Sequence, residues 1–578
     1  MRKLMFLHLT LVLIMLCTAK AFPSNDPLSN CASNSSPETD SIYISGSVSD
    51  THNEPVDEAE VYLYDDQDLL YHGKTARYGK FIAHLQLPSD KLKESRFRLT
   101  IRKTSFIPQS INITATQFAR VDNSYHLNTD IVMPRLIGPA FWISTIIFFI
   151  AYALISFEML HRTIAAMLGA AILLAVSYTI GTIDSEFRIY SYEAAINSID
   201  MNVIFLLMGM MVIVGILKNT GVFQWCAYIS YKMAKGNVFI LAVYLMIFTA
   251  VTSALLDNVT TMLLLTSVAI EICLSLSISP LVLLVPLILA SNVGGTATLI
   301  GDPPNIMIGS YAGLSFLDFV IALTGVCLLS MAVLIGYTKL VWGKDYRSAK
   351  VQDLEKYIQE MKKKYRITDP VLLTYGLAVL GFVVFLFLSH GYWHMEVSVA
   401  ALFGASILLT IAVLTKKVDL IKLIEKDIEW TTLMFFIFLF MLVGAVESSG
   451  LLALIADWIL DLSRGNFIIA CSLIIWVAAI MSAFVDNIPF TATMMPIVAY
   501  LSIAIPDAEN TLWWALALGA CFGGNGTIIG ASANVVTIGI AESRGYKISF
   551  LHFMKLAFPY MIISVLIAHA WLIIFRPA

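Results

Sequence analysis

Residues 253–258 read Ser-Ala-Leu-Leu-Asp-Asn and place a carboxylate inside a long apolar stretch. Residues 482–487 read Ser-Ala-Phe-Val-Asp-Asn and do the same in the second half of the chain. A charged side chain at membrane depth is costly, so its presence there predicts a functional site. The two carboxylates, Asp257 and Asp486, lie 229 positions apart. The pattern therefore predicts an internal repeat with one acidic residue in each copy.

A glycine-rich segment follows each copy at the same distance. Residues 294–305 read Gly-Gly-Thr-Ala-Thr-Leu-Ile-Gly-Asp-Pro-Pro-Asn, and residues 523–534 read Gly-Gly-Asn-Gly-Thr-Ile-Ile-Gly-Ala-Ser-Ala-Asn. Glycines relax the backbone and the Pro-Pro pair cannot continue a helix, so each segment predicts a broken helix. Carbonyl groups at such a break are tolerated in a membrane only where they line a cavity or are buried in protein. The repeat therefore indicates a secondary transporter whose site lies between the two halves.

The composition is that of a membrane protein. Hydrophobic residues make up 58% of the chain and charged residues only 13%, against about 25% charged in soluble domains. The net charge of -4 gives no indication of a nucleic-acid partner. The seven cysteines show no metal-binding spacing and are interpreted as packing residues. No Ser-His-Asp order, P-loop or HExxH motif occurs, which predicts no enzyme and no cofactor beyond a coupling Na⁺ or H⁺.

The N-terminal part differs from the rest of the chain. Residues 1–21 are predicted to be a signal peptide or an uncleaved anchor, because two basic residues precede an apolar run and a small-residue cleavage site. Residues 22–40 are polar and predict a flexible linker. Residues 41–134 alternate between apolar and polar in short runs, which predicts a small β-sandwich. This exported module would have a ligand of its own, which the sequence does not identify.

The remainder predicts an α-helical polytopic membrane protein made of two inverted repeats. The first repeat spans residues 138–341, the second spans residues 370–575, and residues 343–369 form a charged cytoplasmic linker. Each repeat is predicted to hold five spans and one re-entrant hairpin with Asp-Asn at its tip. With the sandwich outside, 20 Lys and Arg residues of the membrane loops fall inside and three fall outside, as the positive-inside rule requires. The alternative of seven crossings per repeat would put the Asp-Asn pairs in external loops.

Each Asp-Asn pair has two interpretations. Asp and Asn are good N-caps, so each carboxylate could simply cap the second arm of its hairpin. A helix N-terminus at membrane depth also attracts an anion, while a carboxylate and unwound carbonyls suit Na⁺ or H⁺. Two independent caps would not need a glycine-rich segment at the same spacing, which favours a transport site.

The predicted site combines the two hairpin tips with the two broken helices. Its members are Asp257, Asn258, Thr260, Gly295, Thr298, Asp302 and Asn305 in the first repeat and Asp486, Asn487, Gly524, Thr527 and Asn534 in the second. The candidate Na⁺ ligands are the two Asp-Asn pairs together with Asn305 and Asn534. Because Asp302 stands opposite Ala531 or Ser532, the two halves are predicted to bind cations unequally.

The segment of residues 292–305 resembles the signature of the ion transporter superfamily. That group includes divalent anion/sodium symporters, citrate transporters, arsenite permeases, NhaD-type sodium/proton antiporters and the melanosomal P protein. The resemblance covers residues 138–575. In the dicarboxylate symporters the hairpin tips carry Ser-Asn-Thr, which binds sodium and the substrate carboxylate. Here the tips read Asp-Asn-Val and Asp-Asn-Ile, which is most similar to the P protein and NhaD branches. Separately, residues 46–81 resemble the carboxypeptidase regulatory-like domain, which implies an accessory module.

The change from Ser-Asn-Thr to Asp-Asn implies cation chemistry, because two carboxylates repel a dicarboxylate unless cations or protons neutralise them. We therefore expect a secondary transporter coupled to Na⁺ or H⁺, working as an antiporter or by cation-coupled anion transport. The alternatives are a sodium-coupled di- or tricarboxylate symporter, an arsenite or other anion permease, and a transporter-derived sensor. Expected partners are a small inorganic or organic ion, the lipid bilayer and, as one option, a second copy in a homodimer. The expected location is the inner or plasma membrane, or an organellar membrane if the source is eukaryotic.

Overall fold

The structure is a computed structural model that describes residues 39–50, 55–65, 68–88, 97–103, 106–114, 117–121, 124–134, 137–157, 159–348, 354–393, 395–505, 508 and 510–576. The chain divides into two compact units. The β unit takes its described residues from 39–48, 55–101 and 110–131, and the helical unit takes most of its residues from 132–576. The predicted signal peptide or anchor and nearly all of the predicted linker lie outside the described residues.

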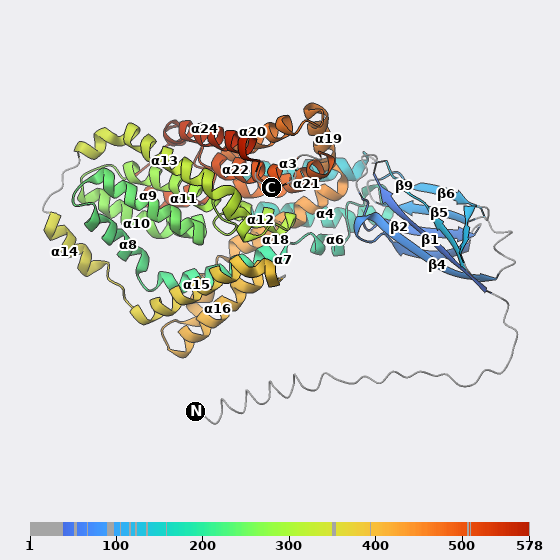
Figure 1. The fold of residues 1–578 in the computed structure, drawn as a ribbon, viewed down its shortest axis with the longest axis horizontal. Helices are drawn as coiled ribbons and strands as arrows, with labels where there is room; N and C mark the ends of the chain where they lie inside the picture. Colours follow the sequence, from blue (N-terminus) through green and yellow to red (C-terminus); the bar gives the residue numbers. More distant parts are fainter. Residues whose placement is uncertain are drawn as a thin grey trace, which may run out of the picture. The chain divides into compact units, whose positions relative to one another are not determined.

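The β unit consists of short strands arranged in two sheets (Figure 1). In chain order the strands are β1 (Thr39–Ser49), β2 (Glu60–Asp65), β3 (Asp68–Lys74), β4 (Lys80–Pro88), β5 (Phe97–Arg102), β6 (Gln109–Ile113), β7 (Ala119–Val121), β8 (Ser124–Asn128) and β9 (Ile131–Val132). One sheet has the order β4-β1-β8-β7, with β9 also on β1, and the other has the order β3-β2-β5-β6. In the first sheet β1 runs antiparallel to β4 and parallel to β8.

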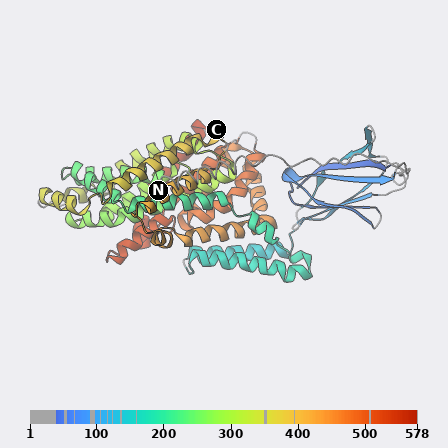
Figure 2. The same cartoon turned by 90° about the horizontal axis from the view of Figure 1, so that it is seen from below.

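The predicted alternation of apolar and polar residues accounts for the core of the β unit. Successive side chains of a strand point to opposite faces of its sheet. Ile42 and Ile44 of β1 and Val61 and Leu63 of β2 are fully buried, whereas the residues between them are only partly buried. Both sheets therefore turn an apolar face inward, as in a sandwich. The view in Figure 2 shows the strands of this unit from below.

The first half of the helical unit contains the first predicted hairpin and broken helix. Its helices are α3 (Pro139–Ser156), α4 (Arg162–Tyr178), α5 (Ile180–Ile183), α6 (Tyr192–Asn197), α7 (Met201–Lys218), α8 (Val222–Met233), α9 (Val238–Leu255), α10 (Asn258–Ser275), α11 (Leu281–Thr296), α12 (Pro303–Ala312) and α13 (Phe316–Ser348). The hairpin is α9–α10, which breaks at Asp257, and the broken helix is α11–α12. The linker helix α14 (Leu354–Lys364) follows.

The second half repeats this order of elements. Its helices are α15 (Pro370–Trp393), α16 (Val397–Leu414), α17 (Leu420–Lys426), α18 (Trp430–Ser449), α19 (Leu451–Ser463), α20 (Phe467–Phe484), α21 (Asn487–Ala504), α22 (Thr511–Gly523), α23 (Ser532–Ser543) and α24 (Phe550–Phe575). The second hairpin is α20–α21 and the second broken helix is α22–α23. Both hairpins and both breaks lie where the repeated sequence pattern predicts them.

The two halves exchange partners at the centre of the helical unit. The first arm of each hairpin packs on the long part of its own broken helix, α9 on α11 and α20 on α22. The second arm packs on the short part of the other half's broken helix, α10 on α23 and α21 on α12. The flanking helices also cross over, since α7 packs on α16 and α4 packs on α18. This exchange brings the two hairpin tips and the two breaks into one central region.

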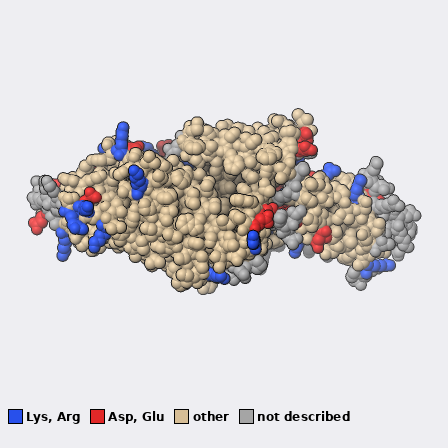
Figure 3. Space-filling view, turned by 90° about the horizontal axis from the view of Figure 1, so that it is seen from above, with Lys and Arg blue, Asp and Glu red and all other residues tan. Residues whose placement is uncertain are grey.

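Twelve helices of the described residues are long and apolar enough to cross a membrane, which confirms the predicted class of helical membrane protein. Both arms of each hairpin are among them, with 18 residues each. A helix of that length reaches about 27 Å, close to the about 30 Å of a bilayer core, so the re-entrant path stays a prediction. Figure 3 shows few described Lys, Arg, Asp or Glu side chains across the middle of the visible helical face, as a lipid-facing surface requires.

Candidate functional site

The two hairpin tips are helix caps as well as carboxylates. Asp257 is the N-cap of α10, where its side chain accepts a hydrogen bond from the Thr260 backbone N–H at 2.8 Å and another from the Thr260 hydroxyl. Asp486 is the N-cap of α21 and accepts from the Ile488 backbone N–H at 3.3 Å. Both carboxylates thus cap a helix, and capping does not prevent either of them from also taking part in a transport site.

Threonine and serine side chains tie each hairpin to its own broken helix in the same way in both halves. The Thr298 hydroxyl donates to the Ala254 carbonyl at 2.5 Å, and the Thr527 hydroxyl donates to the Ala483 carbonyl. On the same arms, the Ser253 hydroxyl donates to the Ser291 carbonyl at 2.7 Å and the Ser482 hydroxyl donates to the Ala520 carbonyl at 2.6 Å. Every one of these pairs keeps the 229-residue offset. The repeat is thus preserved in individual hydrogen bonds.

Asn305 and Asn534 hold the two breaks together. The Asn305 amide Nδ2 donates to the carbonyls of Thr296 at 3.0 Å and Thr298 at 2.8 Å. The Asn534 amide Nδ2 donates to the carbonyls of Gly524 at 2.7 Å and Thr527 at 2.8 Å. Both amide groups are therefore used by the backbone of the break. They do not offer N–H groups to an anion here, and only their side-chain oxygens face other groups.

The glycines act by allowing close approach, which differs from the prediction that they relax the backbone. Gly294, Gly295 and Gly301 all lie outside the positive-φ region. A Cβ atom on Gly301 would lie 2.6 Å from the Ser253 carbonyl oxygen and 2.5 Å from that of Gly295. At Gly530 the distances to the corresponding carbonyl oxygens would be 2.9 Å and 2.8 Å. Each hairpin thus packs against bare backbone at the break.

A carboxylate from the first half meets the hairpin tip of the second half. Asp302 is the N-cap of α12 and is 1% exposed. It accepts hydrogen bonds from the Asn487 amide at 3.3 and 3.4 Å to its two oxygens. Asn258, at the tip of the first hairpin, is close enough to interact with the same carboxylate. Asp302 therefore lies between the two tips, and no described Lys or Arg forms an ion pair with it.

A chain of buried amides continues across the interface between the halves. The Asn292 amide Nδ2 donates to Asn525 Oδ1 at 3.0 Å and to Asn534 Oδ1 at 3.1 Å, and the Asn258 amide donates to Asn292 Oδ1 at 3.5 Å. These four side chains are between 0 and 2% exposed. In the described part of the chain, Asn525 Nδ2 has no hydrogen-bond partner. The centre thus combines one carboxylate with several amide oxygens and one unsatisfied donor.

The structure places most of the predicted site residues in this region but does not make them equivalent. Asp302 and Asn487 come from different halves and touch, and Asn258 and Asn534 both bind Asn292. Thr260 turns toward Asp257, and Gly295 and Gly524 provide close backbone contacts. Asp486 forms an ion pair with Arg162 at 3.0 Å, which sequence reasoning did not predict.

Four residues of this region escaped the sequence reasoning, namely Arg162, Asn292, Cys521 and Asn525. Asn292 and Cys521 occupy the same repeat position, so a search for identical residues passes over both. Cys521 Sγ contacts Asn305 Oδ1 at 3.6 Å, where Asn292 contacts Asn534. The sequence pattern places Arg162 only among the charges of the cytoplasmic loops. A sequence signal that could have identified Arg162 is its position as a single basic residue at the start of an apolar span.

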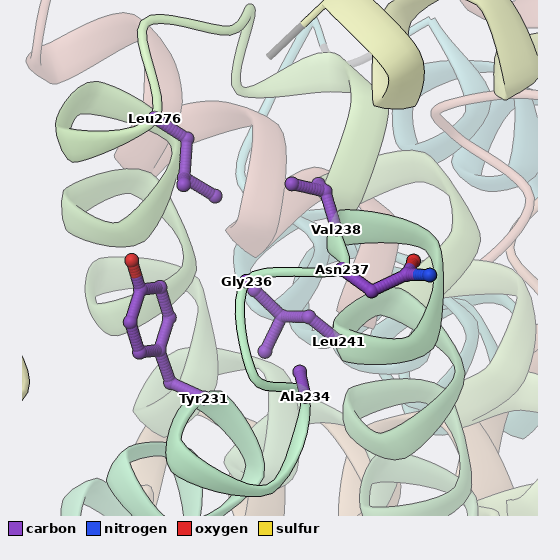
Figure 4. A pocket seen from close by; sticks show the side chains of 7 residues that line it. All are labelled: Tyr231, Ala234, Gly236, Asn237, Val238, Leu241 and Leu276. Carbon is purple, nitrogen blue, oxygen red and sulfur yellow. The ribbon is translucent and has the colours of Figure 1, made fainter. Parts of the chain in front are cut away.

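A small hollow elsewhere in the helical unit lacks the features of an ion-binding site. It lies at the turn between α8 and α9 and is lined by Tyr231, Ala234, Gly236, Asn237, Val238, Leu241 and Leu276 (Figure 4). Its polar residue Asn237 caps α9 by accepting from the Ile240 backbone N–H at 3.1 Å. The lining includes no carboxylate, so we do not assign an ion site to it.

Comparisons with known proteins agree with this architecture. The citrate transporter family model matches residues 152–519. An uncharacterized transporter of Mycobacterium bovis is 39% identical over 434 residues, which cover 74% of this chain and 97% of the relative. The P protein of Homo sapiens is 34% identical over 510 residues, which cover 75% of this chain and 59% of the relative.

A solved structure has the same fold over most of its length. The YdaH transporter of Alcanivorax borkumensis aligns with a TM-score of 0.50 and 12% sequence identity, covering 72% of this chain and 99% of that chain. At this level of identity the likeness concerns the fold alone.

Proposed function

We propose that this chain, which belongs to the citrate transporter family, is a secondary active ion transporter driven by Na⁺ or H⁺. Its class as a multi-pass membrane transporter follows from the family and from its twelve candidate spans. The finer proposal concerns the coupling ion and the residues that carry it, and it rests on the buried centre between the two halves.

The observation that carries the proposal is the position of Asp302. A buried carboxylate without a basic partner is costly unless a proton or a cation neutralises it. Asp302 is 1% exposed, binds Asn487 of the second hairpin and lies near Asn258 of the first. A cation or proton on Asp302 would therefore interact with both tips at once. Its binding and release would bias the packing of the two halves, which is what a coupled transporter needs.

Asp257 is the second proposed carrier. Its side chain accepts hydrogen bonds from the backbone N–H and the hydroxyl of Thr260, and no described Lys or Arg forms an ion pair with it. Helix N-terminal N–H groups and a hydroxyl partly balance its charge, and a mobile cation or proton would complete the balance. Neighbouring amide and carbonyl oxygens are ligands that suit a hard cation such as Na⁺.

A second candidate function is cation-coupled uptake of a carboxylate or another oxyanion. The buried Asn525 Nδ2 group, which lacks a partner among the described residues, favours this candidate because it is free to donate to an anionic oxygen. Bound cations on Asp302 and Asp257 would offset the repulsion between the carboxylates and such an anion. Symport of this kind and antiport use the same cation carriers and differ in what crosses with them.

The orientation is also part of the proposal. The positive-inside rule favours a cytoplasmic linker of residues 343–369 and an extracytoplasmic β unit. Single cysteines at Lys364 and at Arg120 would report the two sides in cysteine-free sealed vesicles, through labelling by a membrane-impermeant thiol reagent. Labelling of both positions from the same side would contradict this orientation.

The decisive experiment is coupled ion flux in proteoliposomes under imposed Na⁺ and pH gradients, with candidate anions as cargo. We expect Asp302→Asn to reduce cation-driven flux at least tenfold. Asn has nearly the shape of Asp but carries no negative charge with which to bind a coupling cation or a proton. Asp461→Asn, at an exposed position of α19, is the matched control and should transport normally. Undiminished cation-driven flux in the Asp302→Asn variant would refute the role of Asp302.

A further inference from the structure

The tip carboxylate of the second hairpin already has a resident cation. Arg162, the first residue of α4, comes from the opposite half of the chain and forms an ion pair with Asp486, with Nη1 3.0 Å from Oδ2. The Arg162 side chain is 25% exposed and the Asp486 side chain is 12% exposed, so water screens the pair only partly. A guanidinium keeps its charge at any physiological pH.

Side chains of α18 and α23 in the second half also hold the guanidinium in place. Nη1 also donates to the Ser532 hydroxyl at the start of α23, at 2.5 Å, and Nη2 donates to the Thr432 hydroxyl of α18 at 3.4 Å. The guanidinium carbon lies 5.1 Å from the centre of the Phe435 ring, which adds a cation–π contact. Ser532 in turn donates to Asp486 Oδ2 at 3.2 Å. Glu429 at the start of α18 also interacts electrostatically with Arg162.

The first half lacks the hydroxyl and aromatic partners of this setting. The positions that match Ser532, Thr432 and Phe435 at the 229-residue offset hold Pro303, Val203 and Leu206, all of which lack a polar side chain or an aromatic ring. Arg162 is the first residue of α4, and the corresponding helix of the second half, α16, begins with Val397. A guanidinium at the first hairpin tip would therefore find no counterpart of the Ser532 and Thr432 hydroxyls or of the Phe435 ring.

The two hairpin tips also differ in the hydrogen-bond donors that neighbouring residues offer to the capping carboxylate. Asp257 is stabilised by the backbone N–H and the hydroxyl of Thr260. The position that matches Thr260 in the second half is Pro489, which has neither group to donate. Asp486 thus lacks the local donors of Asp257, and Arg162 and Ser532 supply them from elsewhere in the fold.

We propose that Arg162 is a tethered counter-cation that occupies the place of a mobile coupling ion at the second hairpin tip. This rests on the proposed cation-coupled function. The second tip would then bind no transported cation through Asp486, and coupling would run through Asp257 and Asp302. Arg162 would act as a positioning residue that sets how many cations move in each cycle.

If Arg162 replaces a mobile cation, its removal should increase the number of cations that are moved in each transport cycle. In Arg162→Gln the Asp486 carboxylate loses its partner and becomes open to one Na⁺ or H⁺. We expect the number of cations moved per cycle to rise by one, measured from the reversal potential of flux in proteoliposomes at several imposed cation gradients. Arg162→Lys keeps a positive charge and should retain the coupling ratio of the wild type.

The double variant Arg162→Gln/Asp486→Asn is the critical control. It removes both charges and should return the coupling ratio to the wild-type value. If Arg162→Gln alone does not give folded protein in size-exclusion chromatography, the double variant decides, and wild-type coupling in it supports the proposal. An unchanged ratio in folded Arg162→Gln, or loss of coupled flux in the folded double variant, would overturn it.

The same measurements separate this inference from the proposed function. Without cation-driven flux in the wild type, the proposed function itself fails before any variant is compared. With cation-driven flux in the wild type and no change of ratio in Arg162→Gln, the function stands and only the tethered counter-cation is refuted.

Discussion

At the scale of single residues, an identical spacing conceals unequal chemistry. Asp257 and Asp486 occupy the same repeat position, yet one is capped by Thr260 and the other is paired with Arg162. The difference follows from neighbouring substitutions such as Thr260 against Pro489, which change the available donors. Asp302 adds a third carboxylate where the second half has Ala531. The predicted inequality of the two halves therefore involves both the tips and the breaks.

The close packing around Gly301 at the first broken helix predicts that a larger residue there destabilises the protein. In Gly301→Ala the new Cβ would lie 2.5 Å and 2.6 Å from two backbone carbonyl oxygens, which belong to Gly295 and Ser253. Because backbone on both sides has to shift, we expect a loss of about 1–3 kcal/mol in the free energy of unfolding. Thermal unfolding of the purified protein in detergent would measure it.

A glycine in open space provides the control for that substitution. Gly336 lies within α13, and a Cβ there meets no atom within 4 Å. Gly336→Ala should keep or slightly raise the unfolding temperature, because Ala favours a helix over Gly. Equal unfolding temperatures for Gly301→Ala and the wild type would show that the contact at the break is not tight.

At the scale of elements, partner exchange is what builds the centre. The first arm of each hairpin packs on its own broken helix, and the second arm packs both on its own broken helix and on that of the opposite half. Asp302 at the start of α12 consequently meets Asn487 at the start of α21. Neither half could assemble this pair alone. A transport site between repeats thus needs both copies, and their small differences give it asymmetry.

The start of α15 gives a prediction about pH. Asp369 caps this helix, and its pKa is lowered by the hydrogen bond from the Leu372 backbone N–H and then by Lys417. A carboxyl group with a lowered folded-state pKa adds stability above its ordinary pKa and loses it as the pH falls through the folded-state value. We therefore expect Asp369→Ala to lower the unfolding temperature at pH 7 and to matter progressively less under acidic conditions below about pH 4.

Asp369→Asn separates the two contributions at that position. Asn still accepts the helix-capping hydrogen bond but carries no charge for Lys417. Its unfolding temperature at pH 7 should lie between those of the wild type and Asp369→Ala, in detergent scans at stepped pH. A difference between wild type and Asp369→Ala that persists undiminished at low pH would contradict the assignment to the ionised carboxylate.

At the scale of the whole molecule, we propose that the β unit is separable from transport. The Mycobacterium bovis relative matches 434 residues of this chain over 97% of its own length, so it is little longer than one transporter. The β unit and the helical unit are each compact. We propose that the β unit is an accessory module for a ligand of its own, in keeping with the boundaries of 41–134 predicted from the sequence.

Deletion of residues 41–134 tests that separation. With residues 1–40 kept in front of residue 135, we expect cation-driven flux per folded transporter within about twofold of the full chain, because the helical core supplies its own packing. Reconstitution at equal amounts of monodisperse protein is the measurement. Loss of flux in a folded, correctly inserted deletion variant would assign the β unit a part in transport.

Local sequence patterns establish the two compositional regions, the positions of the helices and breaks, and the 229-residue repeat. These follow from local patterns, since apolar length, caps and Gly or Pro act within one segment. The contact of Asp302 with Asn487 and the ion pair of Arg162 with Asp486 become visible in the folded structure alone. The same is true of the hydrogen bonds that the amides of Asn305 and Asn534 donate to the backbone. Such pairings join residues up to 324 positions apart. They depend on which helices pack together, and a local pattern carries no information about that.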